Sequence, residues 1–421
     1  MDNVLLNLLK KEIERQETTL ELIPSENFVD LETLFFLGSP LVNKYAEGYP
    51  TKRYYPGNNY IDQIEKLAQD RALKAFNLNN RYWSVNVQPY SGSPANLEIY
   101  LALIQLGETI MGLNLFSGGH LSHGHKVSQT GRIFKSVQYA VNCQTERIDY
   151  GEVETLARKY KPKIIISGAS AYPLRLDFKK FGQIAKNVGA YHLADISHIA
   201  GLVSANLHPS PFPFADIVMT TTHKTLRGPR GAVIFMRKNL EAIVNKTVFP
   251  GFQGGPHIHT IAAIAYAFGQ AKKKSFLLYQ KQIIKNAQRL SFELKKRGFK
   301  LFADGTENHL MLIDLKPLGL DGRTAEAVLE AAGIIANRNS LPGDLSPFNP
   351  SGLRLGAPAI TSRGLKEKDM IMIADWFDHL LLQKKAPIKI KKAVSLFLKR
   401  YPLPYRRWLK LNLPRPVKNL I

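Results

Sequence analysis

The most reactive side chain that the sequence offers is a lysine at the end of an apolar run. Lys224 stands in the stretch TTTHKTLRGPRG, residues 220–231, directly after His223 and near Arg227 and Arg230. Neighbouring cations disfavour the ammonium form of a lysine and favour the free amine, which is the form that attacks a carbonyl. The pattern therefore predicts a lysine that forms a Schiff base.

Two further polar side chains close apolar runs of the kind that form buried strands. The run AYHLAD ends at Asp195, with His198 just beyond it, and the run KIIISGAS ends at Ser170. In open α/β sheets, ligands lie beyond the carboxyl ends of the strands. Pyridoxal phosphate requires a lysine for the Schiff base and a carboxylate that keeps the pyridine nitrogen protonated. Lys224 and Asp195 therefore predict this cofactor; the alternative is a strand cap and a turn.

The stretch PYSGSPANLEIYLALI offers a place for the cofactor's phosphate. Its Ser-Gly-Ser turn, residues 91–93, precedes Pro94, a favoured first residue of a helix, and an apolar helical pattern follows. Free backbone N–H groups and the positive end of a helix dipole attract anions. By itself such a turn is more often a plain N-cap, but together with Asp195 and Lys224 it is predicted to hold the phosphate.

Two other stretches are suited to an amino-acid substrate. Arg354 stands among small residues in SGLRLGAPA, where a guanidinium can grip a carboxylate with two hydrogen bonds; the alternative is a surface arginine of a strand. Glu47 stands in NKYAEGYPTKRYYPG, residues 43–57, an aromatic-rich loop typical of an interface or binding rim. A glutamate in such surroundings is suited to general acid–base catalysis.

The histidine-rich run GGHLSHGH, residues 118–125, has no familiar zinc spacing and contains no cysteine or carboxylate. We therefore expect no metal. We interpret His120 as a flat ring that stacks on a flat cofactor, and His123 and His125 as loop residues.

Four β-branched runs would position these groups as buried strands; they are residues 163–170, 190–195, 215–222 and 231–238. The first two flank a helical pattern, DFKKFGQIAKNVG, which gives a βαβ unit. We predict an α/β fold, with a mostly parallel central sheet covered by helices on both faces and a smaller C-terminal α+β domain. The predicted segments are an N-terminal helix and arm, 1–30, a large cofactor-binding domain, 31–270, a small domain, 271–383, and a basic tail, 384–421.

Composition limits the protein class. At 421 residues and 45% hydrophobic, the chain can bury a large core, and its single cysteine, Cys143, excludes an internal disulfide and favours a reducing compartment such as the cytoplasm. We see no signal peptide and no membrane span. The tail from residue 384 holds eight lysines, four arginines and no acid within a net charge of +23, so nucleic acid is a conceivable but secondary partner.

Together these motifs resemble serine hydroxymethyltransferase, a pyridoxal phosphate enzyme of the aspartate aminotransferase fold type, fold type I. The resemblance runs in family order from residue 12 to residue 380. It is carried by ELIPSENF, NKYAEGYPTKRYYPG, VNVQPYSGSPAN, GGHLSHG, LADISHIAGL, TTTHKTLRGPRG, VFPGFQGGP, ENHLMLIDL, ANRNSLPGD and SGLRLGAPAIT.

The resemblance implies transfer of the serine hydroxymethyl carbon to tetrahydrofolate, giving glycine and methylenetetrahydrofolate through an aldimine and a quinonoid intermediate. It also implies shared active sites in a homodimer or homotetramer. The implied catalytic residues are Lys224, Asp195, Glu47, His223 and Tyr55. The implied cofactor-binding residues are Lys224, Asp195, Ser91, Gly92, Ser93, His120, Ser170, His198, Gly254 and Gly255, the last two from the partner subunit. The expected substrate-binding residues are Ser25, Tyr45, Glu47, Tyr55, Arg230 and Arg354. The implied folate-binding residues are Leu115, Gly119, His120, Leu121, Asn339, Ser346, Pro347 and Phe348.

Four positions depart from the family pattern; they are Pro24, Tyr90, Ser197 and Arg227. A related pyridoxal phosphate enzyme, such as a threonine aldolase or a transferase for an α-methylated amino acid, is the alternative within enzymes. The folate motifs NLFSGGHL and SPF argue against a bare aldolase. A nucleic-acid binder that works through the basic tail is the alternative outside enzymes.

Overall fold

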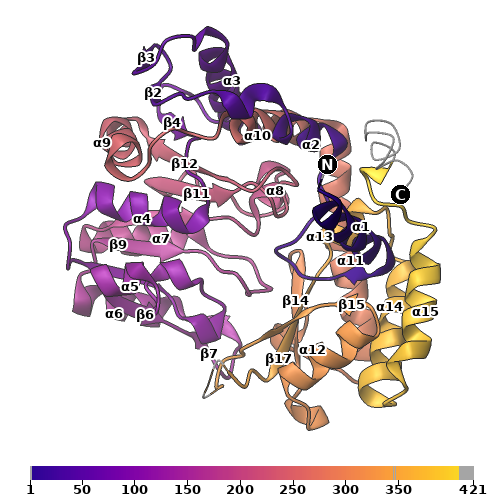
Figure 1. Ribbon diagram of the computed structural model, residues 1–421. Coiled ribbons are helices and arrows are strands. Elements are labelled where there is room, and N and C mark those ends of the chain that lie inside the picture. Colours follow the sequence, from indigo (N-terminus) through magenta and orange to yellow (C-terminus); the bar gives the residue numbers. More distant parts are fainter. Residues whose placement is uncertain (1, 345, 347, 407–421) are drawn as a thin grey trace. The chain divides into compact units, whose positions relative to one another are not determined.

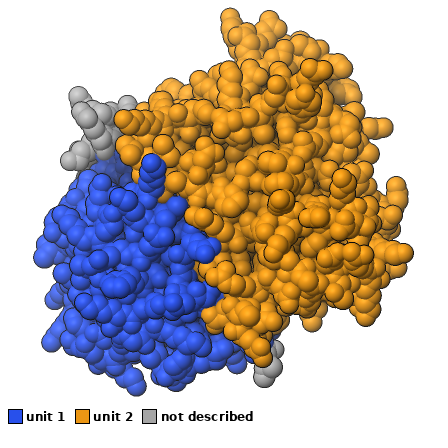
Figure 2. Space-filling model, turned by 180° about the vertical axis from the view of Figure 1, so that it is seen from behind, with its two compact units in different colours: residues 1–31, 281–421 blue, residues 32–280 orange. Residues whose placement is uncertain are grey.

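The computed structural model describes residues 2–344, 346 and 348–406 (Figure 1). Its packing divides the chain into two compact units (Figure 2): unit 1 combines residues 1–31 with 281–421, and unit 2 is residues 32–280. The four segments expected from the sequence are a different division of the chain and stay a prediction. Among the described residues, no helix is long and apolar enough to cross a membrane.

Unit 2 is built on a sheet of seven strands in the order β4-β12-β11-β10-β9-β5-β6. Strand β12 is antiparallel to both of its neighbours, and the other pairs are parallel. All four predicted strand runs are confirmed, as is the βαβ unit. The strands are β4 (Trp83–Asn86), β5 (Thr109–Leu113), β6 (Lys135–Tyr139), β9 (Ile164–Ser167), β10 (Tyr191–Asp195), β11 (Ile217–Thr221) and β12 (Ala232–Arg237). Two small hairpins pair β2 (Gly48–Tyr49) with β3 (Lys52–Arg53) and β7 (Val141–Asn142) with β8 (Arg147–Ile148).

Successive side chains of each strand point to opposite faces of this sheet, and both faces are packed against helices. On β12, Ile234 belongs to the apolar cluster that also contains Ile99 of helix α4. The next residue, Phe235, packs its ring edge-on against Phe76, at the end of α3, and Phe268 of α10. Helices therefore cover both faces, and the predicted mostly parallel α/β fold is confirmed.

The helices of unit 2 are amphipathic where they meet the sheet. In α7 the buried residues Phe178, Phe181 and Ile184 recur at helical spacing, and Gly189 ends the helix in a left-handed conformation. The α-helices are α2 (Leu31–Leu37), α3 (Asn59–Ala75), α4 (Gly92–Leu103), α5 (Gln129–Ile133), α6 (Tyr150–Tyr160), α7 (Phe178–Val188), α8 (Ala200–Ser204), α9 (Glu241–Lys246) and α10 (Ile258–Ala271).

Unit 1 has a four-stranded antiparallel sheet in the order β13-β14-β17-β16, and its N-terminal strand β1 pairs in parallel with β15. The strands are β1 (Leu20–Glu21), β13 (Lys300–Leu301), β14 (Leu310–Asp314), β15 (Ile334–Ile335), β16 (Asn337–Asn339) and β17 (Gly352–Gly356). The helices are α1 (Asn3–Thr18), α12 (Gly322–Ala331), α13 (Pro358–Ser362), α14 (Asp369–Phe377) and α15 (Pro387–Leu398). Helix α11 (Lys274–Lys296) begins in unit 2 and ends in unit 1.

Candidate active site

Asp195 is the buried last residue of β10 and carries a dense set of hydrogen bonds. His123 Nε2 lies 2.9 Å from its Oδ2, which also accepts from the Asn96 side chain at 3.1 Å. The Ser197 N–H donates to Oδ1 at 3.0 Å. Burial opposes ionisation of this carboxyl, but the hydrogen bond and charge of His123 and the Ser197 N–H outweigh it and keep the pKa of Asp195 well below its usual range. Asp195 is therefore a buried, ionised carboxylate, as a partner for a protonated ring nitrogen must be.

The interpretation of His123 as a loop residue is wrong. It lies in the short 3-10 helix η3 (Leu121–His123), is 1% exposed, and its Nε2 lies 2.9 Å from Asp195 Oδ2. Hydrogen bonds also connect Asp195 to His120 through Asn96 and Ser122. Ser122 Oγ accepts from the Asn96 side chain at 2.9 Å, and the Ser122 N–H donates to His120 Nδ1 at 3.1 Å. One feature of the sequence could have indicated this role of His123. It is one of two histidines three residues apart in a glycine-rich turn that follows a strand.

The Lys224 loop follows β11 and lies beside the end of β10, because these two strands are neighbours in the sheet. Lys224 Nζ donates to Thr221 Oγ1 at 2.8 Å. Thr225 Oγ1 donates to the carbonyl of His198 at 2.9 Å, which joins the loop to the segment after Asp195. The predicted lysine, carboxylate and His198 are thus brought together in one unit.

The predicted phosphate turn reaches the same place. Helix α4 begins at Gly92, two residues before the start predicted at Pro94, with Ser91 as an extended N-cap that makes no side-chain capping bond. A Cβ at Gly92 would lie 2.8 Å from Thr221 Cγ2. Glycine at position 92 therefore allows the N-terminus of α4 to approach Thr221, whose hydroxyl binds the Lys224 amine. The N–H groups of this first helical turn have no acceptor within the helix.

Ser170 also lies beside the cluster. Its N–H donates to the carbonyl of Gly118 at 2.7 Å, and a Cβ at Gly118 or Gly119 would collide with Ala171 or Leu113 at 2.4 and 1.9 Å. The loop before His120 is therefore pressed against the end of β5. Leu115 and Leu121, predicted to contact folate, flank this loop in η2 (Leu115–Ser117) and η3.

His223 sits beside the lysine with a strongly lowered basicity. Burial first, then the charges of Lys224 and Arg230, lower the pKa of His223 to about 3. The ring is therefore neutral near pH 7. Its Nδ1 has no hydrogen-bond partner among the described residues. Arg230, predicted to bind substrate, is exposed.

A second group of predicted residues gathers around the loop of Gly254 and Gly255. Tyr45 Oη donates to Glu47 Oε1 at 3.3 Å, and the rings of Tyr45 and Tyr55 lie 5.0 Å apart. A Cβ at Gly254 would lie 3.4 Å from Glu47 Oε1, and one at Gly255 would lie 3.5 Å from the Tyr45 ring. Tyr45 and Tyr55 are exposed at 55% and 44%, so this chain leaves them open for a partner or ligand.

Unit 1 holds the residues predicted for the substrate carboxylate. Arg354 lies on β17, and its Nε donates to Asn337 Oδ1 on the neighbouring β16 at 3.1 Å. Burial lowers the pKa of Arg354 to about 10, which leaves it charged near pH 7. The segment that carries Ser25 runs beside the end of β17, because the Gly356 N–H donates to the carbonyl of Leu22 at 2.7 Å.

The remaining folate positions also belong to unit 1. Asn339 ends β16, and the Phe348 N–H donates to Ser346 Oγ at 3.2 Å. Phe348 is 77% exposed. Pro347 lies outside the described residues.

Each of the four residues that depart from the family pattern contacts a specific neighbour. Tyr90 Oη donates to the carbonyl of Gly255 at 2.9 Å, and Ser197 Oγ accepts from the Thr221 N–H at 3.0 Å. Arg227 stacks on an aromatic ring of α11. Pro24 packs against Gly356, where an added Cβ would lie 2.6 Å from Pro24 Cα.

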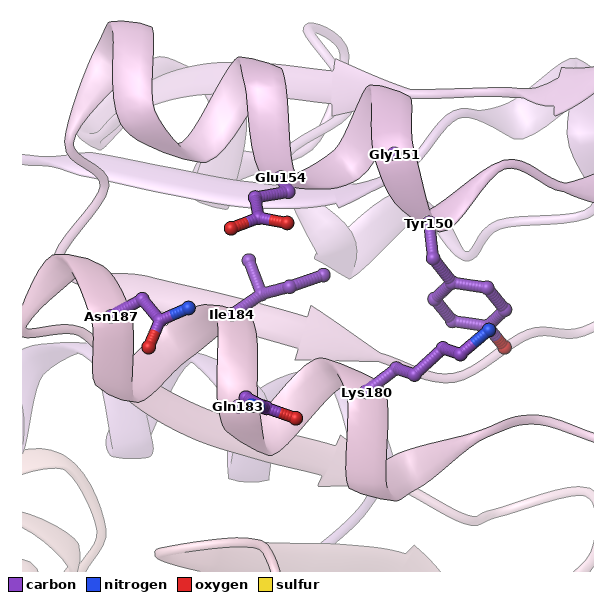
Figure 3. A pocket seen from close by; sticks show the side chains of 7 residues that line it. All are labelled: Tyr150, Gly151, Glu154, Lys180, Gln183, Ile184 and Asn187. Atoms are coloured by element: carbon purple, nitrogen blue, oxygen red, sulfur yellow. The ribbon is translucent and has the colours of Figure 1, made fainter.

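A pocket of about 320 Å³ lies elsewhere in unit 2, between α6 and α7 (Figure 3). Its lining includes Tyr150, Glu154 and Lys180, and the Lys180 ammonium lies over the Tyr150 ring. None of the predicted site residues lines it. Among the described residues, no group of three His, Cys, Asp or Glu side chains is placed to hold a metal ion.

The cluster fits pyridoxal phosphate: it combines an ionised buried carboxylate, a lysine, and a helix N-terminus kept open by glycine. In a comparison with protein-family models, residues 1–377 match the model described as serine hydroxymethyltransferase. The chain belongs to the serine hydroxymethyltransferase family. It is accordingly a pyridoxal phosphate-dependent transferase of one-carbon groups that interconverts serine and glycine with tetrahydrofolate as co-substrate.

Proposed function

We propose that the family reaction takes place at the Lys224–Asp195 cluster, and that Arg354 and Ser25 bind the substrate carboxylate. The observation that carries this proposal is the environment of Asp195, a buried carboxylate that three hydrogen bonds keep ionised. A buried carboxylate is stable in a protein interior only when hydrogen-bonding or charged groups surround it, and a protonated pyridine nitrogen would add such a group.

Each residue of the cluster has a task that its contacts support. Lys224 supplies the amine that attaches the cofactor, and Thr221 holds that amine through its hydroxyl. The first turn of α4, with Ser91, Gly92 and Ser93, holds the phosphate. His120 would stack on the ring, and Ser170 and His198 would contact it. When bound, pyridoxal phosphate supplies an electron sink for the carbon–carbon bond that breaks.

Proton transfer at the substrate hydroxymethyl group is assigned to Glu47, with Tyr45 and Tyr55 beside it. Tyr45 donates to the Glu47 carboxylate, and that charge is the main reason the pKa of Tyr45 is raised, so the phenol keeps its proton. The carboxylate is thereby oriented as a proton acceptor. His223, being neutral, can accept or donate a hydrogen bond beside Lys224 without adding positive charge.

A homodimer with shared sites is the proposed assembly, and the cytoplasm is the proposed location. Support for the dimer comes from Tyr45 and Tyr55, which are exposed in this chain. Tyr45 and Glu47 lie beside Gly255 and Gly254, the residues assigned to the phosphate site of the partner subunit. Support for the location comes from Cys143, a free and exposed thiol that suits a reducing compartment.

The deciding experiment follows the absorbance of the purified protein with pyridoxal phosphate, then with glycine, then with glycine and tetrahydrofolate. We expect a band of covalently attached cofactor, a second band that glycine produces and tetrahydrofolate strengthens, and loss of both in Lys224→Ala. A glycine band that ignores tetrahydrofolate would favour an aldolase. An unchanged attachment band in Lys224→Ala would overturn the assignment of the lysine.

A further inference from the structure

The loop that carries Lys224 is held by two consecutive residues of α11, far from it in the sequence. Gln280 Nε2 donates to the carbonyl of Thr225, the residue directly after Lys224, at 2.7 Å. The guanidinium of Arg227 lies 4.5 Å from the centre of the Tyr279 ring. Tyr279 and Gln280 are the last two residues of unit 2 before the chain enters unit 1.

The Gln280 contact is buried and directional. The side chain is fully buried, and among the described residues no donor reaches its Oε1. A buried amide without a partner for its oxygen is unfavourable, so the Thr225 carbonyl decides how this amide is oriented. The site is also tightly packed, because a Cβ at Gly201 would lie 2.6 Å from Gln280 Nε2 and 2.5 Å from the Thr225 oxygen.

The Tyr279 contact supports an unusual backbone conformation. Arg227 has φ +58°, a left-handed conformation that residues with a side chain rarely adopt. Its N–H closes the loop by donating to the carbonyl of Lys224 at 3.0 Å, and the Gly228 N–H donates to Thr222 O at 2.8 Å. Stacking of the guanidinium on Tyr279 favours this conformation, since cations are attracted to the face of an aromatic ring.

The loop is thus fixed on both sides of its lysine. On one side Thr221 binds the Lys224 amine, and on the other Thr225 and Arg227 are held by α11. The Thr225 hydroxyl adds contacts with the His198 carbonyl and the Gly201 N–H. Without the α11 contacts, the backbone after Lys224 would lose two of the restraints that fix the position from which the Lys224 side chain extends.

We propose that Gln280 and Tyr279 are positioning residues for Lys224: they fix the loop so that the amine can reach the cofactor's carbonyl carbon. There the amine nitrogen would form a C=N bond while the C=O bond breaks and its oxygen leaves as water. The inference rests on the proposed role of Lys224 as the attachment site. Neither side chain touches the reacting atoms. Their removal should slow covalent attachment while the fold persists, because small misplacements of a reacting group cost large factors in rate.

The test measures how fast the full-length protein, stripped of cofactor, attaches pyridoxal phosphate. Attachment is trapped with borohydride at timed intervals and located by peptide mass. We expect Gln280→Leu and Tyr279→Leu each to slow attachment at Lys224 by about tenfold or more. Tyr279→Phe, which keeps the ring, should attach at the rate of the unsubstituted protein. Thermal unfolding of each cofactor-free variant checks the fold.

Gln282→Leu is the matched control. Gln282 lies on the same helix, but its amide donates to Asn286 and Glu367 within unit 1 and not to the lysine loop. Equal attachment rates, within twofold, for Tyr279→Leu, Gln280→Leu and Gln282→Leu would overturn the inference. Should Gln280→Leu fail to fold, the comparison of Tyr279→Leu with Tyr279→Phe decides alone. Attachment of the cofactor at a residue other than Lys224 in the unsubstituted protein would instead refute the proposed function.

Discussion

His123 and Asp195, 72 residues apart in the chain, are joined by a 2.9 Å hydrogen bond inside unit 2. Both side chains are almost fully buried, at 1% and 8% exposure. The pair explains how a carboxylate can stay ionised at the end of a buried strand. Among the groups that lower the pKa of Asp195, His123 is the strongest.

Replacing His123 by leucine should weaken cofactor binding. Burial already opposes the ionised form of Asp195, so loss of the His123 contact should raise its pKa and reduce the charge that faces the pyridine nitrogen. We expect pyridoxal phosphate to dissociate about tenfold more readily at pH 7, given that hydrogen bonds to charged groups contribute about 1.5–3 kcal/mol. Equilibrium dialysis measures this, with His125→Leu as the control. An unchanged dissociation constant would contradict the assigned electrostatic role.

Glu98 should make the protein less stable as the pH rises. It lies fully buried on α4, and among the described residues neither carboxyl oxygen has a hydrogen-bond partner. Burial raises the pKa of Glu98 from 4.5 to about 8. Because the folded state holds this proton more tightly than the unfolded state, the stabilisation is complete below pH 4.5 and is lost as the pH rises to about 8.

Glu98→Gln should remove this dependence. The free energy of unfolding of the variant, relative to the unsubstituted protein, should rise by about 1.4 kcal/mol for each pH unit across that window. Urea unfolding at pH 5 and pH 8 measures the difference, and Glu154→Gln, at the pocket between α6 and α7, serves as the comparison. A constant difference at both pH values would show that Glu98 has a charge partner in the folded protein.

Arg53 should be indispensable for the loop that carries Tyr45, Glu47 and Tyr55. Its guanidinium pairs with Asp62 at 2.9 Å and Glu65 at 2.6 Å, and it donates to two carbonyls of the loop. Arg53→Met would leave the Glu65 carboxylate buried without its cation, which costs about 3–5 kcal/mol.

The matching double substitution, Arg53→Met with Glu65→Met, should recover the part of that loss that comes from the Glu65 carboxylate, because this buried charge is then absent. Chemical unfolding of the single and double variants measures both values. If the double variant is as unstable as Arg53→Met alone, the cost comes from lost packing and not from the uncompensated carboxylate.

Arg363 should hold the basic C-terminal segment on unit 1. Its side chain donates to the carbonyls of Leu398 and Tyr401 and to those of Gln16 and Glu17 at the end of α1. Helix α15 is therefore docked on the protein, although its lysines face solvent; Trp408 lies outside the described residues. Arg363→Met should speed tryptic cleavage at the lysines of residues 384–399 about tenfold, given that such hydrogen bonds contribute about 1.5–3 kcal/mol. Arg400→Met is the control, and equal cleavage in both would contradict the anchoring role.

The sequence by itself determined the strands and the chemistry of the motifs. Runs such as IIIS and IVMTT are rich in β-branched residues, whose restricted side chains pack well on a pleated surface, and this favours buried strands. A lysine and a carboxylate at the ends of such runs already predicted a cofactor site, because parallel strands end at the same edge of a sheet.

Only the tertiary structure decided which side chains serve those groups. His123 and Gln280 form hydrogen bonds with Asp195 and Thr225, which are distant in sequence, and no local periodicity encodes such a pair. The start of α4 at Gly92 was decided in the same way, by the close approach of Thr221. Strand order and helix packing set these distances, and both depend on contacts throughout the chain and not on any one segment of it.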